Sequence, residues 1–157
     1  MKKILTLVLT LVMGLTLLTG CDPVADELET FVNDNMGTVA ANTQAMKDEV
    51  AKWETYETEA EMIAGIKDII IPKVTASIEL IDKAELKTDE VKTLRDKCKK
   101  ALETYKAGFE DILSALESGD ADAATAAMQK ISDANTYLEE YNAELEKLAE
   151  EKEIDRK

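Results

Sequence analysis

The sequence predicts an all-α protein, an antiparallel up-down-up-down four-helix bundle with long helices. Three observations predict this fold. Ala, Glu, Lys and Leu, which favour helix, are abundant along the chain. Apolar residues recur with gaps of three and four in four long stretches, the period of a bundle seam or coiled coil. Short polar hinges separate these stretches, and short hinges make successive helices antiparallel.

The first helix is expected to begin directly after Cys21. Asp22 can cap it, and Pro23 suits its first position. Gly37 is a weak point inside this helix and not a break. The apolar stripe consists of Leu28, Val32, Met36, Val39, Thr43, Met46, Val50 and Trp53.

The second helix is expected to begin at a capping box, because Thr58 and Glu61 have the required spacing. Pro72 stands inside it and removes the hydrogen bond to Asp68, so the second helix is predicted to be kinked or broken at Pro72. A kink would either open a pocket between helices or let a long helix follow a curved core. The apolar stripe is Ile63, Ile66, Ile70, Val74, Ile78 and Ile81.

Thr88 or Asp89 is expected to cap the third helix, which ends before Gly119, and Asp120 is expected to cap the fourth. From about residue 150 the chain is charged on all faces and is expected to fray. The third stripe is Val91, Leu94, Cys98, Ala101, Tyr105, Phe109, Ile112 and Leu116. The fourth is Ala124, Met128, Ile131, Ala134, Leu138, Tyr141, Leu145 and Leu148.

Residues 1–20 have the features of a secretory signal. Two lysines precede an apolar run of about 15 residues (4–18), and small residues follow. The run is shorter than the 18 or more residues expected of a membrane-spanning helix. The sequence therefore predicts a cleaved signal peptide (1–20) and one helical domain (21–157).

The segment Leu18-Thr19-Gly20-Cys21 resembles the bacterial lipobox, which lipoprotein signal peptidase reads. The resemblance implies cleavage between Gly20 and Cys21, a diacylglyceryl group on the Cys21 thiol and usually an acyl group on the new amine. More than one acyl chain is what stable membrane anchoring requires. Asp22 resembles the inner-membrane retention signal of enteric bacteria. It therefore favours the outer, extracytoplasmic face of the cytoplasmic membrane over the outer membrane.

The charge and composition exclude several classes of function. The net charge is −14, and loss of the two signal lysines takes the mature side chains to about −16. Such a body repels nucleic acid and anionic lipid, so the acyl anchor should hold it on the membrane. The chain has no histidine, which removes Ser-His and Cys-His catalysis, histidine-ligated zinc, di-iron bundle sites and the usual haem ligand. We expect no catalytic site, metal or cofactor.

Once Cys21 is lipidated, Cys98 is the only remaining thiol. Lysines at positions 97, 99 and 100 could lower its pKa and make it reactive. Its place on the third apolar stripe instead favours a cysteine that is simply packed in the core. The sequence leaves the two interpretations open.

The predicted topology places both termini and the hinge at 83–92 at the anchored end. The opposite tip would carry aromatic residues in an acidic rim, a composition that resembles a protein-binding patch. Alternatively, Trp53 plugs the core and the acids are solvated. The candidate partner tip consists of Trp53, Glu54, Tyr56, Glu57, Glu117 and Asp120.

These features predict a non-catalytic protein-interaction, scaffold or spacer module of the bacterial cell envelope. Its partners would be the membrane and an unidentified envelope protein, and a homo-oligomer stays open. The alternative is a small-ligand-binding lipoprotein with a pocket near the Pro72 kink. The pocket walls would be Met36, Met46, Met62 and Met128, although methionine at helical spacing is more often core filler.

Overall fold

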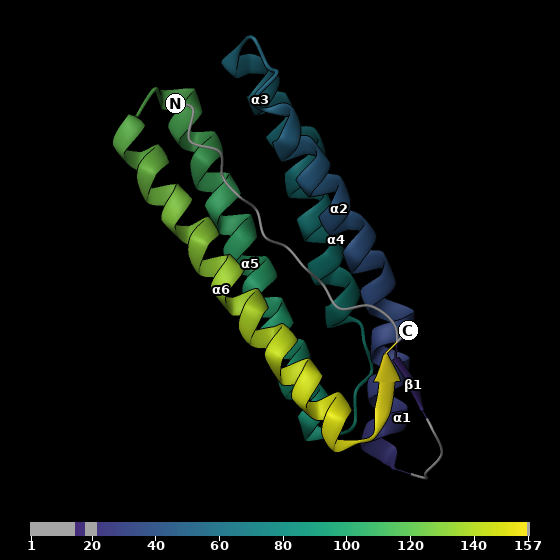
Figure 1. Cartoon of the computed structure of the whole chain (residues 1–157). Helices are drawn as coiled ribbons and strands as arrows, with labels where there is room; N and C mark the ends of the chain where they lie inside the picture. The colour runs from purple at the N-terminus through teal and green to yellow at the C-terminus, as the bar shows by residue number, and fades with distance from the viewer. Residues whose placement is uncertain (1–14, 18–21, 157) are drawn as a thin grey trace.

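The computed structural model describes residues 15–17 and 22–156. The lipobox, its cleavage site and most of the signal peptide lie outside these residues. The described chain is helical, which confirms the all-α class, and it forms four rods (Figure 1). The exceptions are two three-residue strands, β1 (Leu15–Leu17) and β2 (Ile154–Arg156), which form one antiparallel pair.

Two of the four rods change helical type along their length. The first rod is α1 (Pro23–Phe31), a π-helical segment η1 (Val32–Met36) and α2 (Gly37–Lys52). The second is α3 (Glu59–Gly65), the π-helical η2 (Ile66–Ile70) and α4 (Ile71–Asp82). The third and fourth are the unbroken helices α5 (Asp89–Ser118) and α6 (Ala121–Glu151). α2 packs on α4, α4 on α5 and α5 on α6, and α1 also contacts α5 (Figure 1).

The sequence signals for helix ends operate as expected. The Asp22 side chain caps α1, and Thr58 and Glu61 form a complete capping box at α3. Gly119 takes the left-handed conformation (φ 69°) just past α5, and the Asp120 carboxylate accepts two backbone N–H bonds at the start of α6. These four local predictions are confirmed.

The second rod is not broken at Pro72. The five-residue η2 comes directly before α4, and the Ile71 N–H bonds the Ile66 carbonyl, five residues back. Pro72 therefore stands in the first turn of a new α-helical segment, where a proline is tolerated. A kink at this point stays a prediction.

The core consists largely of the predicted stripes, and it adds Phe31 and Leu102, which the stripes omit. Met36 and Met46 are buried, while Met62 and Met128 pack partly against the core, so all four act as core filler. Burial raises the pKa of the Cys98 thiol to about 12, which supports the packed interpretation of this cysteine.

The C-terminal segment differs from the frayed end expected from about residue 150. α6 continues to Glu151, and the chain reverses at Glu153, which has a positive φ of 54°. β2 then pairs with β1, with Leu17 opposite Ile154. Ile154 is buried and belongs to the core cluster, which gives this charged segment one apolar contact point.

Two buried tyrosines make a matched pair for mutagenesis. The Tyr105 hydroxyl donates a hydrogen bond to Asn135 Oδ1, whereas the Tyr141 hydroxyl has no partner among the residues that the structure describes. We expect Tyr105→Phe to lower the free energy of unfolding by about 1 kcal/mol, because Asn135 loses its donor. Tyr141→Phe should be neutral or stabilising, because it removes a buried hydroxyl that lacks a hydrogen bond. Urea unfolding of both variants tests the difference, and equal losses would contradict it.

Candidate functional site: the two ends of the bundle

The first and last helices are tied together at one end of the bundle. The Lys152 ammonium lies 2.8 Å from Asp22 Oδ2, and the Asp22 carboxylate also caps α1. The hydrogen bond from Lys152 is the largest of the effects that lower the pKa of Asp22. Cys21, the predicted lipidation site, directly precedes Asp22 in the sequence and lies outside the described residues. We call this region the anchor end.

Glu27 fastens the hinge between α4 and α5 to the same end. Its carboxylate accepts the backbone N–H groups of Lys87 (2.6 Å) and Thr88 (2.8 Å) and the Thr88 hydroxyl. Thr88 is the N-cap residue of α5, but its side chain contacts Glu27 instead of capping. The largest single effect on the pKa of Glu27 is desolvation, which raises it. The hydrogen bonds and the nearby Lys87 charge together outweigh desolvation, so the pKa of Glu27 lies below its ordinary value.

This lowered pKa predicts an acid-sensitive anchor end. Because the folded-state pKa of Glu27 is depressed, its contribution to stability is present above the unfolded value of 4.5 and is lost as the pH falls through the folded value. Lowering the pH from about 5 to about 3 should therefore reduce the free energy of unfolding of the Glu27→Gln variant by less than it reduces that of the unsubstituted chain. Glu29→Gln on the same helix is the control. Parallel pH profiles for Glu27→Gln and the unsubstituted chain would contradict the assignment.

The far end contains the hinge between α2 and α3 and the hinge between α5 and α6 (Figure 1). Trp53 lies partly buried at the first hinge and meets Phe109 of α5 edge to face, with ring centroids 6.3 Å apart. Its indole Nε1 is buried and has no hydrogen-bond partner among the described residues. This geometry favours the interpretation that Trp53 closes the end of the core.

The charged residues of the candidate tip divide between local contacts and solvent. Glu117 forms an ion pair with Lys67 and so joins α5 to η2. Asp120 is the α6 cap. Glu54 and Glu57 are exposed at the α2–α3 hinge.

Glu49 is a buried carboxylate that sequence reasoning did not single out. It is 1% exposed, and it accepts a hydrogen bond from the Tyr56 hydroxyl and an ion-pair contact from Lys52 at 3.0 Å. Because the Tyr56 hydroxyl donates to Glu49, the pKa of Tyr56 rises to about 12. Tyr56 therefore helps to hold the α2–α3 hinge in place by covering a buried charge.

The Glu49 carboxylate lies against Gly65 of α3. A Cβ atom on Gly65 would stand 2.0 Å from Glu49 Oε1, so only glycine leaves space for the carboxylate where it lies. An open hollow of about 310 Å³ adjoins this contact. Its lining contains none of the four methionines and not Pro72. The lining residues are Glu49, Lys52, Tyr56, Glu61, Ala64, Gly65, Asp68 and Ile69.

Two glycines of the helical rods should respond to alanine in opposite directions. Gly65→Ala should lower the free energy of unfolding by about 1–2 kcal/mol, because Glu49 must give up buried, charge-assisted hydrogen bonds. Gly37→Ala should raise it by about 0.5–1 kcal/mol, because a Cβ there meets nothing within 4 Å and alanine favours helix. Denaturant unfolding measures both, and stabilisation by Gly65→Ala would contradict the role of Glu49.

The described residues offer no group of three or more His, Cys, Asp or Glu side chains placed to hold a metal ion. Within the same part of the chain, no helix has the length and hydropathy to cross a bilayer.

The described residues form a helical protein. The family model described as "Uncharacterised lipoprotein PM1805" matches residues 25–153, and the chain belongs to this family. No curated protein and no solved structure matches the chain. Family membership confirms the predicted lipoprotein class, and it supports attachment to a membrane through lipid.

Proposed function

We propose that the chain is a non-catalytic scaffold or spacer of the bacterial cell envelope, anchored by lipid on Cys21 and offering its far end to a protein partner. The observation that carries this proposal is the position of the anchor end. The Asp22–Lys152 pair and the Glu27 contacts gather both ends of the helical body and the α4–α5 hinge at one end, and Asp22 directly follows Cys21 in the sequence. The other two hinges then lie at the far end (Figure 1).

The dimensions of the rods suit a spacer. α6 has 31 residues, which corresponds to about 46 Å at 1.5 Å per residue. We take the rods as an up-down-up-down bundle standing on the membrane. Exposed Glu54 and Glu57 would then be presented at about this height above the lipid surface.

The membrane face and the absence of catalysis are part of the same proposal. Asp22 favours the outer face of the cytoplasmic membrane, although its cap and its Lys152 contact give it a structural role as well. The lack of histidine in the sequence supports a non-catalytic role. The alternative of a small-ligand pocket near Pro72 gains no support from the four methionines, because they pack in or against the core.

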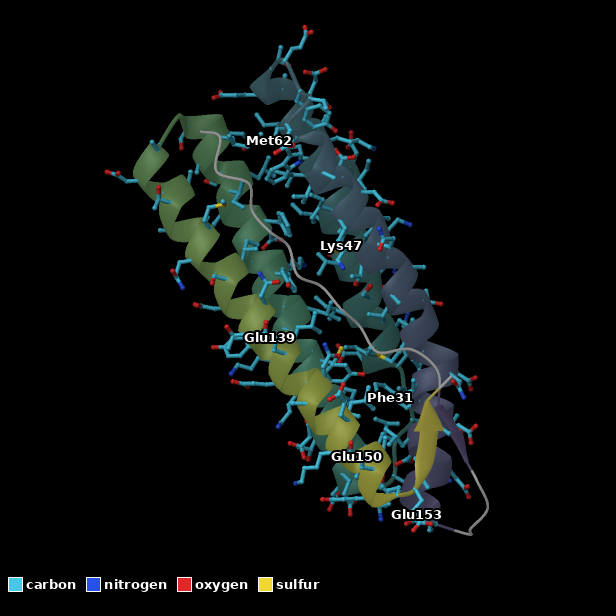
Figure 2. The ribbon with its side chains drawn as sticks, viewed as in Figure 1. Phe31, Lys47, Met62, Glu139, Glu150 and Glu153 are labelled. Atoms are coloured by element: carbon cyan, nitrogen blue, oxygen red, sulfur yellow. The ribbon has the colours of Figure 1, made fainter. Side chains whose placement is uncertain are left out.

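Site-specific photocrosslinking in cells of the native host tests the proposal. A photoreactive residue at Glu54 or Glu57 should give a discrete adduct with one envelope protein. The matched control is Glu139, which is exposed on the side of α6 (Figure 2). Adducts from Glu139 alone, or none from the far end, would overturn the proposal.

A further inference from the structure

The strand β2 pairs with a segment that maturation is proposed to remove. β1 and β2 are antiparallel, with Thr16 opposite Asp155 at the centre of the pair. Cleavage between Gly20 and Cys21 would remove all of β1, since β1 ends at Leu17. The mature chain keeps β2 and loses the strand that covers it.

The edge of β2 that β1 covers lies against the helical body. β1 lies beside α1 as well as beside β2 (Figure 1). Ile154 of β2 is buried in the core cluster, and β2 also contacts α6. Departure of β1 therefore leaves main-chain N–H and C=O groups of β2 without their strand partner, next to helix surface at the anchor end.

We infer that in the mature protein this edge accepts an extended, uncharged segment of a partner envelope protein, which adds as a strand to β2. The signal segment shows the chemistry that the edge takes. β1 reads Leu-Thr-Leu, with no charge and with a β-branched residue at its centre. The inference rests on the signal cleavage in the proposed function, and it names the chemistry of a partner.

Two other occupants fit the edge less well. A second copy of the body would bring about sixteen net negative charges against an equal number, and the two bodies would repel. Lipid acyl chains offer no hydrogen-bond partners for the main chain of β2. A polypeptide strand satisfies the main-chain groups of β2.

The test uses the mature, lipidated protein in nanodiscs and a peptide of residues 14–18 with a neutral solubilising linker. Added peptide should bind saturably and slow hydrogen exchange at the amides of β2. A second peptide carries both Thr16→Pro and Leu17→Pro. Successive N–H groups of a strand point to opposite edges, so one of these two neighbouring residues has its N–H directed at β2. Replacing both with proline therefore removes that donor, whichever residue carries it. This peptide should bind at least about tenfold more weakly.

The uncleaved Cys21→Ala precursor is the matched control. Its own β1 should protect β2 without added peptide and should block binding in trans. The inference is overturned if the mature chain binds no peptide, if the proline peptide binds equally, or if precursor β2 is unprotected. A dimer mass with protected β2 and no peptide would assign the edge to a second copy and would also overturn it. Neither readout depends on crosslinking from Glu54 or Glu57, so the two proposals fail separately.

Discussion

Replacing Phe109 with alanine is expected to lower the free energy of unfolding by about 4 kcal/mol. Phe109 is fully buried in α5, and its ring meets the ring of Trp53 in a T-shaped contact. The substitution leaves a cavity and also removes the partner that positions the α2–α3 hinge. Urea unfolding measured by far-UV circular dichroism gives the change directly.

A double-mutant cycle separates the cavity from the ring contact. If the two rings interact as the geometry indicates, Trp53→Ala should cost about 1 kcal/mol less in the Phe109→Ala background than alone. Ser114→Ala, at an exposed position of the same helix, is the control and should stay within about 0.5 kcal/mol of the unsubstituted chain. Strict additivity of the Trp53 and Phe109 substitutions would show that the two rings do not stabilise one another.

Replacing Cys21 with serine is expected to abolish lipid attachment, the largest effect on function. Without the thiol, no diacylglyceryl group can be added, and the chain should keep residues 1–20. Each buried methylene contributes about 0.8 kcal/mol to membrane binding, so the loss of acyl chains removes the main anchoring energy. Intact mass spectrometry of protein from the native host measures both outcomes: the missing acyl mass and the retained signal peptide.

Cys98→Ser is the control for this experiment, because Cys98 is buried in the core and its thiol has a raised pKa. This variant should mature normally and carry the acyl mass. Acyl mass on the Cys21→Ser variant would show that lipid is attached elsewhere in the chain.

The helix boundaries were predictable because they depend on local chemistry. Asp22, Thr58 with Glu61, Gly119 and Asp120 satisfy backbone groups within a few residues of their own position, so the sequence pattern is sufficient. The seams were equally visible, because burial of a long helix follows its 3.6-residue period.

The contacts that hold the two ends depend on residues far apart in the sequence, and these were not predictable. Glu49 lies one position from the predicted seam residue Val50, but only its meeting with Gly65 makes it a buried carboxylate. Glu27 reads as a surface acid until the fold brings the Lys87 and Thr88 amides to it. The π-helical segments η1 and η2 also escaped prediction, because their hydrogen-bond register has no distinct sequence period.

The Asp22 cap has a mechanical consequence for the anchored protein. Helix α1 begins at Pro23, so lipid attachment at Cys21, as proposed, would leave almost no free chain before the helical body. A flexible linker would let the far end sweep through a hemisphere and meet partners at many heights. Without one, the proposed orientation would restrict Glu54 and Glu57 to a thin layer at about 46 Å from the lipid surface. In the proposed function, partners would then be selected by their distance from the membrane as well as by their chemistry.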